Sequence, residues 1–142
     1  MPDASARGES DVFLSSLNAQ RDHVLGILEG LPAEALRRPV LPSGWTALGL
    51  VNHLALDVER FWFRVIMTGE DVELPEDAEA WQVSVATPLG TPPAQWPERW
   101  SSWRLANLRE VLLHVITETA CHAGHLDAVG ELIDGHQWMV LT

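Results

Sequence analysis

Length, composition and charge set the first limits on this chain of 142 residues. Hydrophobic residues make up 46% of it, which is enough to bury a core, since a chain of this size removes roughly two-thirds of its unfolded surface from water. We therefore expect a single domain over residues 1–142. Acidic residues outnumber basic ones by 20 to 9, and the net charge of −11 disfavours nucleic acid and anionic lipid surfaces as partners.

Neither a membrane span nor a secretory signal is visible in the sequence. The longest apolar stretch, residues 48–67, is interrupted by charged side chains, whereas a bilayer requires about 20 apolar residues. The N-terminus lacks the basic start and apolar run of a signal peptide, and the single cysteine, Cys121, cannot form an internal disulfide. We expect a cytoplasmic protein with no membrane contact, in which Cys121 is a buried thiol.

Two helices are expected in the first half of the chain. Apolar residues recur every three or four positions from about Ser10 to Glu29, and Gly30 stands where a helix-ending glycine is favoured. After a proline-rich loop, Thr46 offers a hydroxyl cap for a second helix that runs to about Met67. A period of 3.6 residues predicts the apolar face of this second helix: Leu48, Val51, Leu54, Val58, Phe61, Trp62 and Val65.

The second half of the chain predicts a loop and one more long helix. Residues 70–105 are rich in proline and tryptophan, which predicts an ordered loop that packs on the helices, with one short helix after Pro97 and only a weak strand pattern at 81–86. Asn107 and Glu110 have the spacing of a capping box, so the last helix begins here and ends at Gly135. The predicted fold is all-α.

Polar residues occupy one stripe of this last helix. His114, Glu118, His122 and His125 lie within about 80° of arc, together with the apolar Val129 and Leu132. Glu118 and His122 are four residues apart, a spacing that suits a divalent metal such as zinc, nickel, iron or manganese. A solvated face of histidine and glutamate explains the spacing equally well.

A histidine on the second helix favours the metal site. His53 stands among apolar residues, and helices packed about 8–10 Å apart would bring it to Glu118 and His122, giving three ligands and an open position. Asp57 would then orient His53 or act as a fourth ligand, although a salt bridge to Arg60 or Arg64 explains it equally well. His23, on the first helix, is expected at the surface. Tryptophans are expected mainly in the core, with a rim of indoles around the metal position as the alternative.

Several segments resemble the DinB-like metalloprotein superfamily, in the branch that includes mycothiol-dependent maleylpyruvate isomerase. The resemblance lies in "PSGWTALGLVNHLALDVERFWF" and "LREVLLHVITETACHAGHLDAVGELIDG", and in the opening "QRDHVLGILEGLPAEALRRPVLPSG". It implies an up-down four-helix bundle with a divalent metal held by His53, Glu118 and His122. His125 and His114 would lie near the pocket, and Asp127 matches the signature without an assigned role.

The chain departs from that family pattern where the third bundle helix should be. The Pro/Trp-rich loop stands in its place, so we expect three long helices with one open flank, covered by the loop or by a second subunit; a homodimer is our prediction.

The resemblance implies a metal-dependent thiol transferase that acts on a small electrophile. Its cosubstrate would be a low-molecular-weight thiol such as mycothiol or bacillithiol, and zinc is the favoured metal, with nickel, iron and manganese as alternatives. Two other functions remain open. One is a hydrolase that uses the same metal with water, and the other is a non-catalytic metal-binding stress-response protein whose ion only stabilises the bundle.

Overall fold

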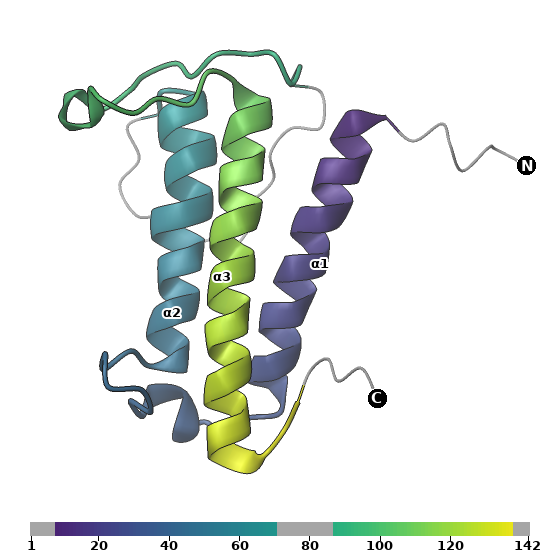
Figure 1. The fold of residues 1–142 in the computed structure, drawn as a ribbon, viewed down its shortest axis with the longest axis vertical. Coiled ribbons are helices and arrows are strands. Elements are labelled where there is room, and N and C mark those ends of the chain that lie inside the picture. Colours follow the sequence, from purple (N-terminus) through teal and green to yellow (C-terminus); the bar gives the residue numbers. More distant parts are fainter. Residues whose placement is uncertain (1–7, 71–86, 138–142) are drawn as a thin grey trace, which may run out of the picture.

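The computed structural model describes residues 8–70 and 87–137, which form a bundle of three long helices (Figure 1). The elements are α1 Glu9–Glu29, η2 Ala35–Arg37, α2 Ala47–His53, η3 Leu54–Met67, η5 Glu98–Trp100 and α3 Leu108–Asp134. Helix α2 continues directly into η3, and the two form one rod that runs antiparallel to α1 and α3 (Figure 1). The described residues contain no strand, so the predicted all-α fold is confirmed; the weak strand pattern at 81–86 lies outside them.

The helices begin and end where local sequence signals predicted. The Thr46 hydroxyl accepts a hydrogen bond from the backbone N–H three residues later at 2.9 Å, and Asn107 caps α3 in the same way at 3.1 Å. Gly69 and Gly135, which follow η3 and α3, have φ values of 71° and 74°. This left-handed conformation is open to glycine at little cost and ends a helix.

The second rod differs from the prediction in the width of its turn. From Leu54 onward it is a π-helix, in which residue i bonds to i+5 and each turn takes about 4.4 residues. Phe61 and Val65, which a period of 3.6 placed in the core, are therefore only half-buried. The buried apolar residues of η3 instead fall in two rows with steps of four or five residues: Leu54, Val58, Trp62 and Ile66 in one, and Val58, Phe63 and Met67 in the other.

The core lies between the three rods, and α3 contacts both others. Leu17 of α1 and Val111, Val115 and Leu126 of α3 are fully buried. No described helix has the length and hydropathy that a membrane span requires.

Three predictions about single side chains were wrong. His23 is not at the surface: its side chain is 13% exposed because α1 packs on α3, and its Nε2 lies 2.9 Å from both carboxylate oxygens of Asp127. Cys121 is exposed, because at 100° per residue it lies on the other side of α3 from the buried Ala123 and Leu126. Leu132, expected on the inward stripe, is 66% exposed, because the buried residues near it, Leu126, Val129 and Gly130, lie further round the helix and leave Leu132 at the outer edge of the stripe.

A cluster of four indoles covers one flank of the bundle. The loop after residue 87 crosses the ends of η3 and α3 (Figure 1) and brings three tryptophans onto Trp62 of η3. We call the four the tryptophan cluster: Trp62, Trp96, Trp100 and Trp103. Their ring centroids lie 5.5 to 5.8 Å apart, so the described part of the loop, from residue 87 onward, packs on the helices as predicted. The homodimer stays a prediction, for which light scattering should give twice 15.7 kDa.

Candidate metal centre

Three side chains from two rods meet between α2 and α3. His53 is the last residue of α2, and Glu118 and His122 are one turn apart on α3. One nitrogen or oxygen atom from each lies within 4.8 Å of the others. His122 Nε2 is 3.5 Å from Glu118 Oε2, and the rings of His53 and His122 meet edge to face with centroids 5.1 Å apart. The structure thus brings together the three residues that the sequence predicted would converge.

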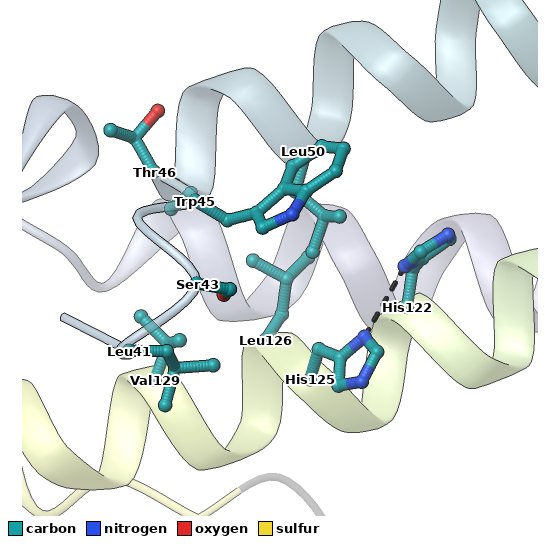
Figure 2. Close-up of a pocket in the computed structure, with 10 residues that line it drawn as sticks. Leu41, Ser43, Trp45, Thr46, Leu50, His122, His125, Leu126 and Val129 are labelled. Atoms are coloured by element: carbon teal, nitrogen blue, oxygen red, sulfur yellow. Dashed lines mark hydrogen bonds between the residues drawn. The ribbon is translucent and has the colours of Figure 1, made fainter. Parts of the chain in front are cut away.

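Each of the two imidazoles has a partner on its Nδ1 atom. His53 Nδ1 lies 3.0 Å from Asp57 Oδ2, and His122 Nδ1 lies 3.3 Å from His125 Nδ1, the contact drawn as a dashed line in Figure 2. A partner on one ring nitrogen sets the tautomer and leaves the other nitrogen for a ligand. Asp57 therefore contacts His53, whereas Arg64, one of the arginines considered as its partner, pairs with Glu70 at 3.1 Å.

Burial favours the neutral form of two histidines in this region. Desolvation lowers the pKa of His122, the nearby His53 and His125 lower it further, and Glu118 opposes the shift. Desolvation also lowers the pKa of His114, against the attraction of Glu118, whose Oε1 lies 3.7 Å from His114 Nε2. Neutral imidazole is the form that binds metal ions, because the ring nitrogen then has a free lone pair.

The donor set fits a borderline divalent cation. Two imidazole nitrogens and one carboxylate oxygen suit zinc and its neighbours in the first transition row. Metal–ligand bonds of about 2.0–2.1 Å place tetrahedral ligand atoms roughly 3.4 Å apart. The 3.5 Å contact between His122 and Glu118 already has this spacing, and the other pairs of candidate ligand atoms lie within 4.8 Å of each other. The side chains of His53, Glu118 and His122 are only 27%, 36% and 16% exposed, which argues against a merely solvated face.

Two hollows flank the three residues. The first, of about 240 Å³, is apolar and lies between the loop before α2 and α3, with Trp45, Leu50 and Val129 in its wall and His122 and His125 at one end (Figure 2).

The second is a wider groove of about 610 Å³ on the other side, which we call the tryptophan groove. It is lined by His53, Leu56, Asp57, Val58, Phe61, Trp62, Arg99, Trp100, Trp103, His114 and Glu118. The sequence suggested a rim of indoles but missed Arg99, because no periodicity places a side chain of an irregular loop.

The fold and the site together define a class of protein: an up-down helical bundle with a possible His/Glu metal site between two of its helices. The family model for mycothiol-S-transferase matches residues 12–101 and 78–135. Together these ranges span residues 12–135, and the chain belongs to the mycothiol-S-transferase family, within the DinB-like superfamily that the sequence resembled. No curated protein and no solved structure matches the chain.

Proposed function

We propose that this protein is a divalent-metal-dependent S-transferase that joins mycothiol, or a related low-molecular-weight thiol, to a small electrophile. The observation that carries the proposal is the convergence of His53, Glu118 and His122 in a chain of the mycothiol-S-transferase family. Three protein ligands would leave a coordination position of a bound ion open to a thiol.

The residues around the cluster have distinct roles in this proposal. His53 and His122 would hold the ion through Nε2 and Glu118 through its carboxylate, while Asp57 and His125 orient the two rings. A divalent cation, with zinc the best fit, would lower the pKa of a bound thiol and so supply thiolate at neutral pH.

The reaction forms one S–C bond. The thiol gives up its S–H proton to solvent, the sulfur electron pair bonds to the electrophilic carbon, and a leaving group departs with the electron pair of the broken bond. With a conjugated alkene nothing departs, and a proton adds to the neighbouring carbon instead. Because the thiol must be reduced, we place the protein in the cytoplasm.

Metal content provides the first test. Purified protein should contain about one equivalent of zinc per chain, by elemental analysis, and His53→Ala and His122→Ala should both lose it. His136→Ala is the matched control, because His136 is an exposed histidine just beyond α3 and lies outside the cluster. Equal metal content in all four proteins would contradict the ligand assignment.

Turnover provides the second test. Zinc-loaded protein should accelerate the reaction of mycothiol with an aryl halide such as 1-chloro-2,4-dinitrobenzene, followed by loss of free thiol, and the metal-free protein and His122→Ala should not. Ester hydrolysis that needs zinc and no thiol would favour the hydrolase. Inactivity in both assays with every metal would favour the non-catalytic alternative.

A further inference from the structure

We infer that the tryptophan groove binds the electrophile and selects a planar apolar molecule with an anionic group, of which an aromatic carboxylate is the simplest. The proposal has two parts. The role of the bound molecule as acceptor of the thiol rests on the proposed function, whereas the binding itself rests only on the residues that line the groove.

The walls of the groove present flat aromatic surface. Trp62 is 4% exposed and forms the floor, with Trp100 stacked on it at an interplanar angle of 22°. Trp103 meets Trp62 at 90° and is 42% exposed. A planar ligand can lie against the exposed ring of Trp103 with its face or its edge, and aromatic pairs of this kind contribute about 0.5–1.5 kcal/mol beyond the area they bury. An exposed indole beside a hollow is therefore a binding surface for a planar apolar molecule.

These walls are held in place without a ligand. The Trp96 indole N–H donates to the backbone carbonyl of Trp103 at 3.1 Å, and the loop is tied to the start of α3 by a 2.9 Å bond from Leu108 N to Thr91 O. Because the rings are already ordered, binding costs little conformational entropy in the protein.

Arg99 gives the groove a positive charge. Three other arginines of this acidic chain form salt bridges with carboxylates: Arg21 with Glu59, Arg64 with Glu70 and Arg109 with Glu9. Arg99 lines the groove, and among the described residues it makes no salt bridge; its guanidinium instead lies over Trp100, 5.2 Å from the ring centroid. A guanidinium beside an aromatic wall suits a carboxylate attached to a planar ring, which it can bind bidentately.

The charges that line the groove come from different elements, and this sets the direction of the ligand: Arg99 belongs to η5 of the loop, whereas Asp57 belongs to η3 and Glu118 to α3. His53, Asp57 and Glu118 line the same groove as Arg99. A carboxylate next to Asp57 and Glu118 would be repelled, whereas at Arg99 it is attracted. The opposite, uncharged end of the ligand then lies toward the candidate metal centre, so the reacting carbon should be remote from the carboxylate.

Binding of cinnamate and of its uncharged analogue cinnamyl alcohol tests the inference without any turnover. Calorimetry on the full chain, with and without zinc, should show cinnamate binding at least threefold more tightly than the alcohol, with quenching of tryptophan fluorescence. Arg99→Gln should weaken cinnamate binding by about three- to tenfold, the size expected for one charge-assisted hydrogen bond at a half-open site, and leave the alcohol unchanged. Arg104→Gln is the matched control, because Arg104 lies over Trp96, 5.8 Å from its centroid, and does not line the groove.

The outcomes separate this inference from the proposed function. Equal affinity for cinnamate and the alcohol, or an equal loss in the Arg99 and Arg104 variants, would overturn the inference even if thiol transfer is found. If cinnamate binds as expected but no metal-dependent thiol transfer occurs, the proposed function fails and the groove remains a binding site. Arg99 is exposed, so its substitution should leave the fold intact, and near-ultraviolet circular dichroism verifies this.

Discussion

At His53 and His122 a contact at Nδ1 leaves Nε2 as the ring nitrogen that is available to a metal ion. Asp57 lies on the same helical rod as His53, four residues further on, and it contacts Nδ1 at 3.0 Å. An imidazole bound in this way keeps its orientation and has a more basic free nitrogen. The carboxylate therefore matters to metal affinity although it is not assigned to the ion.

Asp57→Asn should lower zinc affinity by roughly ten- to one-hundredfold, the usual cost of losing such a partner. Competition with a chromophoric chelator measures the affinity. Asp127→Asn is a matched control, because Asp127 also contacts a histidine, His23, in a pair that lies outside the cluster. A similar loss of affinity in both variants would contradict the specific role of Asp57.

The lowered pKa values of His114 and His122 predict how stability depends on pH. Protons bind these two side chains more weakly in the folded protein than in the unfolded chain, whose histidines titrate at about 6.5. Their contribution to stability is complete above that pH and is lost as the pH falls through the lower, folded-state values. Urea unfolding of the metal-free protein should therefore give a smaller free energy of unfolding at pH 5.5 than at pH 7.5.

His114→Gln isolates this effect, since glutamine does not titrate. Its free energy of unfolding should change less between pH 7.5 and 5.5 than that of the parent protein. An equal or steeper change in the variant would mean that other groups cause the pH dependence.

On the scale of single elements, the ends of the helices were predictable and the pitch of the second rod was not. A cap is a local device: Thr46, Asn107 and Gly135 act on backbone within a few residues, so the sequence alone reveals them. The choice between an α-turn and a π-turn depends instead on how the whole face packs. The apolar residues between Leu54 and Met67 are dense enough to satisfy either period, and only the packed structure distinguishes them.

Two phenylalanines test the π-helical period. Phe63 is 6% exposed in the core, whereas Phe61 lies half-buried in the tryptophan groove. Phe63→Ala should cost about 3–5 kcal/mol of unfolding free energy, the range for a fully buried phenylalanine, and Phe61→Ala clearly less. Chemical denaturation of the metal-free proteins compares them. A larger cost at Phe61 would indicate that the rod has a period of 3.6 in solution.

On the scale of the whole molecule, the sequence predicted which residues converge but not how the site is enclosed. Spacing placed Glu118 and His122 on one face, and His53 stood out because an imidazole among apolar residues needs a partner. The tryptophan groove depends on contacts between residues about forty positions apart, such as Trp62 and Trp103, and no local pattern encodes such contacts. The same limit hid the pairing of His23 with Asp127, which joins α1 to α3 across 104 residues.

Metal removal distinguishes a catalytic ion from a structural one. The most deeply buried side chains, among them Leu17, Val111 and Leu126, pack between the rods without involving the candidate ligands, so the metal-free protein should remain folded. Binding adds stability by mass action, about 2.7 kcal/mol at a free zinc concentration one hundred times Kd. For a chain of this length that gain should raise Tm by about 5–10 °C.

Scanning calorimetry of chelator-treated protein, with and without added zinc, measures this shift. His122→Ala should show no zinc-dependent shift, since it lacks one of the three proposed ligands. Complete unfolding of the parent protein on chelation would show that the ion stabilises the bundle itself. That result would favour the non-catalytic alternative, because a catalytic ion only has to be held by a fold that forms without it.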